Sequence, residues 1–109
     1  MMELLPLPDV ATALGVPVNR VAQFVRDGHL VATSTGGGPR GVPALFVQDG
    51  AIVKSLPSVI TMLRDAQFSD HEIIDWLHRN DESLPGTPIE ALRANRGSEV
   101  KRRAQVAGY

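Results

Sequence analysis

The sequence predicts a mostly α-helical fold with one small β-hairpin, on three observations. Residues 9–47 begin with the pattern of two short helices separated by a tight turn. A strand-like segment, a glycine-rich loop and a second strand-like segment follow. Helical apolar spacing then returns after residue 55 and continues to the end. This order is typical of a winged helix-turn-helix (residues 1–50) followed by a helical C-terminal bundle (residues 51–109) packed on it.

The composition is that of a small globular protein. The chain has 109 residues, of which 43% are hydrophobic, so it can build a core. It has no cysteine, which excludes disulfides and thiolate zinc sites. Its first residues do not have the pattern of a signal peptide, and no apolar run is long enough to span a membrane. We therefore expect a cytoplasmic protein.

Charge is unevenly distributed, although the net charge is only −1. Residues 1–64 carry five Lys/Arg and four Asp/Glu. Residues 65–90 carry one Lys/Arg and seven Asp/Glu, whereas residues 91–109 carry five Lys/Arg and one Asp/Glu. The chain thus has a near-neutral head, an acidic middle and a basic tail. Only the head loop and the tail could offer positive surface to phosphates.

The first two predicted helices have clear start and stop signals. Asp9 is expected to cap the first helix, and Gly15 to end it. The second helix is expected over residues 18–27, with Gly28 ending it.

The second predicted helix has two distinct faces. Its apolar stripe, expected to face the core, contains Val18, Val21, Ala22 and Val25. Its other side carries Asn19, Arg20, Gln23, Arg26 and Asp27. Asn, Arg and Gln are side chains that bind base edges and phosphates in the major groove, although an ordinary solvated helix face has the same composition.

The next segment predicts a wing. His29–Thr33 alternates like a strand, and Leu45–Val47 is expected to form the returning strand. Between them, Thr35–Gly41 is too rich in glycine for regular structure, and Arg40 supplies a positive charge. The alternatives are an ordinary hairpin loop or a nucleotide-binding loop. The latter would need a Lys-Ser/Thr ending and a strand-to-helix context that this sequence lacks.

Residues 51–109 predict a short strand and four helices. The strand is expected at residues 51–54, and the first helix starts at residues 55–57. A capping box (S-x-x-E) at residues 69–72 starts the second helix, which should run to Arg79 with Trp76 central to this half.

Another capping box, at residues 87–90, starts the third helix, which is expected to end at Gly97. Ser98 is expected to cap the last helix, which exposes the basic cluster Lys101–Arg103. This cluster could bind phosphates. It could equally neutralise the acidic middle or complement the dipole of its own helix.

The sequence contains no recognisable catalytic motif. His71, Asp75 and His78 have the spacing of one helix face and could ligate a metal, but solvated helix faces often carry such residues. A catalytic carboxylate pair would need a cleft, for which so small a chain has little room. We expect a protein that is not an enzyme and needs no cofactor or metal.

Two sets of motifs resemble known families. Ala13–Val16 (ALGV) and Asp27–Leu30 (DGHL) resemble the helix-turn-helix of MerR-like and excisionase-like regulators. Nearly the whole chain, residues 6–107, resembles the Rv2175c-like family of small actinobacterial DNA-binding proteins. The motifs that carry this second resemblance are Trp76–Leu77, Ser83–Pro88, Ala91–Arg93 and Glu99–Gln105.

The second resemblance implies a winged helix-turn-helix DNA-binding protein with a helical C-terminal domain. By position in the motif it makes Arg20, Gln23 and Arg40 candidate contacts. Family members can carry an N-terminal extension with phosphorylatable residues, but Met1–Asp9 has no Ser or Thr, so we do not expect such regulation here. The pattern from Trp76 through LPGTPIEAL also resembles, over a shorter stretch, the toxin-binding domain of Xre/MbcA/ParS-type antitoxins.

The sequence therefore predicts a DNA-binding protein, a transcriptional regulator or a nucleoid-associated protein. Helix 18–27 would enter the major groove of double-stranded DNA, and the wing at residues 33–41 would contact the backbone. The candidate contacts are Asn19, Arg20, Gln23, Arg26, Arg40, Arg102 and Arg103. The alternative is a protein-interaction module, antitoxin-like or dimerising, with weak DNA binding. The sequence leaves open the operator, a homodimer and a protein partner for the C-terminal domain.

Overall fold

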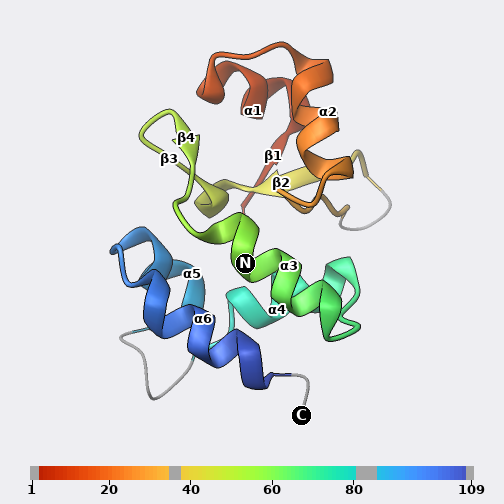
Figure 1. Ribbon diagram of the computed structural model, residues 1–109. Coiled ribbons are helices and arrows are strands. Elements are labelled where there is room, and N and C mark those ends of the chain that lie inside the picture. Colours follow the sequence, from red (N-terminus) through yellow and green to blue (C-terminus); the bar gives the residue numbers. More distant parts are fainter. Residues whose placement is uncertain (1–2, 35–37, 81–85, 108–109) are drawn as a thin grey trace.

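The computed structural model describes residues 3–34, 38–80 and 86–107. It confirms the mostly helical fold with a small antiparallel wing (Figure 1). The elements in chain order are β1 (Leu4–Pro6), α1 (Leu7–Leu14), α2 (Val18–Arg26), β2 (Gly41–Pro43), the 3-10 helix η1 (Ala44–Phe46), β3 (Val47–Gln48), β4 (Ala51–Ile52), α3 (Leu56–Asp65), α4 (Asp70–Leu77), α5 (Pro88–Arg93) and α6 (Gly97–Val106).

Helix α1 begins three residues earlier than predicted. Its first residue is Leu7, so Asp9 lies inside the first turn and is not the N-cap. Pro6 has an extended backbone and Pro8 is in the first turn, where a missing N–H costs nothing. Gly15 ends the helix as expected, with a left-handed φ of +69°.

Helix α2 turns only part of its predicted apolar stripe to the core. Val21 is fully buried and Val25 packs against the core. Val18, however, is 45% exposed, so its predicted core position is wrong. Val16, in the turn before the helix, packs against the core at this corner, while Val18 lies outside it.

The predicted strand at His29–Thr33 is not a strand. Leu30, Val31 and Ala32 are all buried, one after another, whereas a half-buried strand would alternate. Thr33 alone pairs, in an isolated bridge with Gly41. Residues 35–37 of the predicted loop lie outside the described residues.

Strand β2 pairs with the N-terminal strand β1, antiparallel, with Leu5 opposite Val42. The predicted strand at Leu45–Val47 is mainly η1, and only Val47 lies in a strand, β3. The pairing with β1 ends where the Ala44 N–H donates to the Glu3 carbonyl oxygen at 2.9 Å, and Pro43, whose ring holds its φ at −52°, is the residue from which the 3-10 turn starts. Strands β3 and β4 then form a hairpin across Asp49–Gly50. Both turn residues have a positive φ, as tight hairpins require.

The C-terminal helices begin largely where their caps predict. Both capping boxes are present, at α4 and α5. Helix α5 ends at Arg93 and not at Gly97, because Asn95 adopts a left-handed φ of +65° that stops it. Gly97 then starts α6, so Ser98 is not the cap. Helix α4 ends at Leu77, two residues earlier than expected.

One hydrophobic core joins the two halves. Leu30 and Phe46 from the first half and Leu63 and Leu77 from the second are fully buried in the same cluster. Trp76 is only half-buried at its edge, so the predicted central position is wrong. No helix of the described ranges is long and apolar enough to cross a membrane.

Polar contacts also tie the halves together. The Arg93 guanidinium of α5 donates from Nη1 to the carbonyl oxygens of Leu45 and Val47, both at 2.9 Å. In return, Gln48 Nε2 donates to the carbonyl oxygen of Arg93 at 3.3 Å.

Candidate nucleic-acid interface

The exposed face of α2 brings four predicted contacts together. Asn19, Arg20, Gln23 and Arg26 are all exposed, and they lie opposite the buried Val21. In Figure 1 this helix lies at the upper end of the molecule, beside α1. The second helix of a helix-turn-helix is the one that enters the major groove, so this face has the position and the donors of a reading surface.

The Arg20 side chain is held in place by its neighbours along the helix. Its Nη1 donates to Gln23 Oε1 at 3.3 Å, and its Cζ lies 5.1 Å from the centroid of the Phe24 ring. The Phe24 ring is in turn 5.9 Å from that of His29. A cation–π contact at an exposed site contributes about 0.5–1 kcal/mol, which favours one orientation of the guanidinium.

Phe24 was not among the predicted site residues. It was assigned to neither face of the helix, yet it is partly buried and packs against the core, three residues after Val21. The sequence does indicate its contact with Arg20, because the two residues are four apart and residues four apart on a helix are neighbours.

The wing residue Arg40 is exposed and lies directly before β2. Gly41 fixes the base of the wing by two backbone hydrogen bonds: its N–H donates to the Thr33 carbonyl at 2.7 Å and its carbonyl accepts from the Thr33 N–H at 2.9 Å. A Cβ at Gly41 would lie 3.0 Å from Leu4 Cβ and from the Leu5 carbonyl oxygen. Glycine thus allows β1 and the wing to approach closely.

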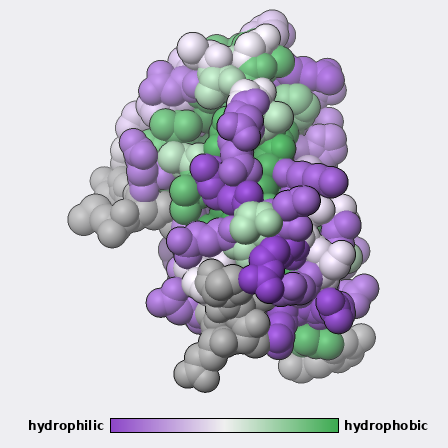
Figure 2. All heavy atoms as spheres, turned by 90° about the vertical axis from the view of Figure 1, so that its left-hand side faces the viewer, coloured by the Kyte–Doolittle hydropathy of each residue, from purple (hydrophilic) through white to green (hydrophobic). Residues whose placement is uncertain are grey.

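The two basic residues of the tail do not join this face. Arg102 and Arg103 are exposed on α6, beside Val106, which is 60% exposed. Together with Glu99 they line a shallow hollow. Helix α6 packs on α3 and α5 at the lower end of the molecule, away from α1 and α2 (Figure 1). Figure 2 shows one side of the molecule, and its lower half is mostly hydrophilic.

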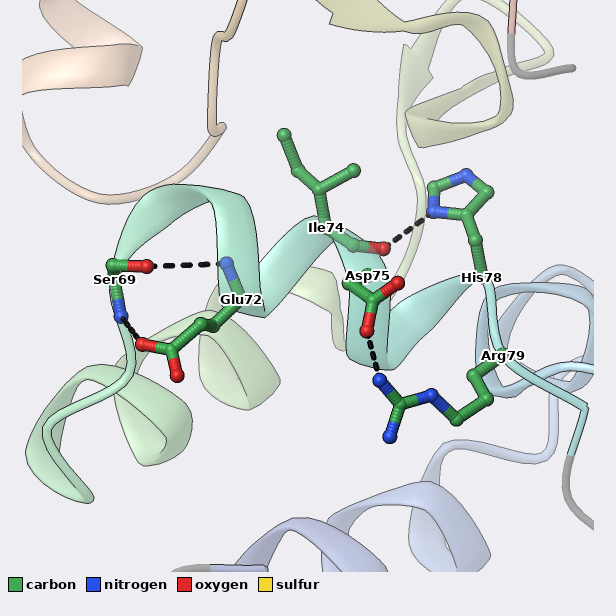
Figure 3. Close-up of polar contacts among 6 residues, drawn as sticks. All are labelled: Ser69, Glu72, Ile74, Asp75, His78 and Arg79. Carbon is green, nitrogen blue, oxygen red and sulfur yellow. Dashed lines mark hydrogen bonds and ion pairs between the residues drawn. The ribbon is translucent and has the colours of Figure 1, made fainter.

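The polar residues of α4 stabilise the helix itself (Figure 3). Ser69 Oγ accepts from the Glu72 N–H, and Glu72 Oε1 accepts from the Ser69 N–H. Asp75 pairs with Arg79, and His78 Nδ1 donates to the Ile74 carbonyl at 2.8 Å.

The three residues at α4 that have the spacing for a metal site, His71, Asp75 and His78, are not brought together around one point. Two of the three, Asp75 and His78, contact protein groups. Within the described part of the chain, no three His, Asp or Glu side chains are grouped so as to hold a metal ion.

A helix-turn-helix with an exposed Asn/Arg/Gln face on its second helix, followed by an antiparallel wing, defines a winged helix-turn-helix protein. Two family models match the chain. Residues 1–47 match the model described as DNA-binding protein Rv2175c, wHTH domain, and residues 53–108 match the Rv2175c C-terminal domain of unknown function. The chain belongs to the Rv2175c family of DNA-binding proteins.

Individual relatives agree with this assignment. The chain is 44% identical over 115 residues to the DNA-binding protein Rv2175c of Mycobacterium tuberculosis (strain ATCC 25618 / H37Rv), an alignment that covers 94% of this chain and 79% of the relative. It also matches the NMR structure of Rv2175c with a TM-score of 0.88 and 41% identity, over 99% of this chain and 82% of that one.

Proposed function

We propose that this protein is a transcriptional regulator, associated with the nucleoid in the cytoplasm and without catalytic activity. It inserts α2 into the major groove of double-stranded DNA and contacts the neighbouring backbone with the wing at residues 33–41. The observation that carries the proposal is the exposed face of α2, on which four polar side chains lie together and Arg20 is oriented by Gln23 and Phe24.

The contacts have different expected roles. Asn19 and Gln23 carry amides, which suit bidentate hydrogen bonds to adenine. Arg20 and Arg26 can reach guanine or phosphate, and Arg40 supplies a positive charge to the backbone beside the groove. Few cations face the DNA, so affinity should be modest and salt-sensitive unless two copies bind together.

A second candidate function concerns the C-terminal half, as a protein-interaction module. The observation that favours it is the position of Val106, Arg102 and Arg103, which are exposed on the half of the molecule away from α2. On this proposal the tail arginines serve a protein partner or a second copy of the chain and not the duplex held by α2.

Gel-shift titrations of a short duplex over a range of salt concentrations test both proposals. We expect Arg20→Ala and Arg40→Ala each to weaken binding and to lower the slope of log affinity against log salt by about 1, the value of one lost phosphate contact. The matched control is Arg79→Ala, an exposed arginine after α4 that pairs with Asp75, which should bind as the wild type does.

The outcomes are distinguishable. Unchanged affinity for both Arg20→Ala and Arg40→Ala, with folding preserved by circular dichroism, would overturn groove-and-wing binding. A double variant, Arg102→Ala/Arg103→Ala, should bind the short duplex normally. If it loses affinity instead, the tail contacts DNA and the second candidate function fails.

A further inference from the structure

Val18 lies in an unusual position for a large apolar side chain. Among the described residues, only three large hydrophobic side chains are exposed: Val18 at 45%, Leu45 at 38% and Val106 at 60%. Val18 is the one on α2, and it is the first residue of that helix. The core does not need it, since Val16 packs at this corner and Val21 fills the buried face.

Val18 lies at the edge of the exposed polar face of α2. Asn19, the next residue, is exposed. Ala22 and Arg26 follow at i+4 and i+8, so Val18 begins the edge of α2 that ends at Arg26. The opposite edge of the polar face is formed by Arg20 lying over Phe24. At the start of the helix, the exposed side chain of Val18 thus borders the polar face of α2.

We propose that Val18 is a specificity-determining residue that contacts the 5-methyl group of a thymine. This inference rests on the proposed insertion of α2 into the major groove. In that groove the thymine methyl is the only apolar feature of the base edges, and apolar side chains recognise it by contact. The first residues of a recognition helix are those that meet base edges. Val18 and Asn19 then form an adjacent pair suited to thymine and adenine.

Thymine-to-deoxyuridine replacement tests this contact, since it removes the methyl group alone and keeps every hydrogen-bonding group. Fragments bound by the wild-type protein are first enriched from random DNA. Each thymine of the enriched site is then replaced in turn and the dissociation constant is measured at fixed salt. We expect one position at which the replacement weakens wild-type binding about fourfold, the value of one buried methyl group.

The same replacement should weaken the binding of Val18→Ala less than that of the wild type, because this variant lacks the two γ-methyl groups of the valine. Val106→Ala is the matched control, an exposed valine on α6 that should keep the wild-type response. Because both valines are exposed, neither variant should unfold, and circular dichroism checks this. No enriched sequence, no sensitive thymine, or equal sensitivity in Val18→Ala would overturn the inference.

Arg20→Ala, measured on the same site, separates this inference from the proposed function. If Arg20→Ala loses affinity while no thymine is sensitive, α2 enters the groove but Val18 does not read a methyl group. If Arg20→Ala and Arg40→Ala both bind as the wild type does, the insertion of α2 itself is wrong.

Discussion

At the scale of single residues, Gly41 shows how one missing side chain positions the wing. Its two backbone bonds to Thr33 close the base of the wing, and on its other side it faces β1. A Cβ here would lie at 3.0 Å from both a Leu5 backbone oxygen and Leu4 Cβ, neither of which is the mobile end of a side chain.

We therefore expect Gly41→Ala to destabilise the protein by about 1–3 kcal/mol, the usual cost of overpacking. Urea denaturation measures the free energy of unfolding. Thr33→Ala is the control, because it leaves the backbone bonds of the bridge intact and should change stability by no more than about 0.5 kcal/mol. Equal stability of Gly41→Ala and the wild type would mean that β1 can move aside freely.

At the scale of elements, the capping boxes are the part of the fold that the sequence predicted best. Each box is made within four residues, so no distant contact is needed to form it. The strands are the part predicted worst. The pairing of Gly41–Pro43 with Leu4–Pro6 joins segments far apart in the chain, and local alternation carries no information on it.

The capping boxes also predict a pH dependence. Backbone hydrogen bonds from Ser69 and Thr87, followed by their hydroxyl groups, lower the pKa of Glu72 and of Glu90 below the usual 4.5. A lowered carboxyl pKa in the folded state means that the boxes stabilise the fold above pH 4.5. This stabilisation is lost as the pH falls through the lowered values.

Thermal denaturation between about pH 7 and pH 3 tests this dependence. The double variant Glu72→Gln/Glu90→Gln keeps an oxygen acceptor in each box but cannot titrate. We expect its melting temperature to fall less steeply than that of the wild type below pH 4.5. Parallel curves for the two proteins would contradict the assignment of acid sensitivity to these boxes.

At the scale of the whole molecule, the sequence predicted which polar residues of α2 share its exposed face but not where the basic tail lies relative to them. Asn19, Arg20, Gln23 and Arg26 follow from the 3.6-residue period of one helix. Arg102 and Arg103 were candidates by charge alone, and charge does not indicate on which side of a bundle a helix packs. The exposure of Val18 was missed for a similar reason, because periodicity does not show which neighbour covers the end of a helix.

The continuous core and the Arg93 contacts imply that the two halves unfold together. Arg93 donates to Leu45 and Val47 across the junction, and removing the guanidinium would leave two carbonyl oxygens without this donor. We expect Arg93→Met, which keeps much of the apolar stem, to lose about 1–3 kcal/mol of stability. Arg79→Met is the control, since its exposed i,i+4 pair with Asp75 contributes only about 0.3–0.5 kcal/mol.

Two probes follow the unfolding of the wild type and of Arg93→Met in urea. Fluorescence of Trp76, the single tryptophan, reports the C-terminal half, and far-ultraviolet circular dichroism reports all helices. In the wild type we expect coincident transitions, the sign of two-state unfolding. Arg93→Met should shift both to lower urea together. If instead the tryptophan transition separates from the circular dichroism transition in the wild type, the halves are independent folding units and Arg93 is not a necessary link between them.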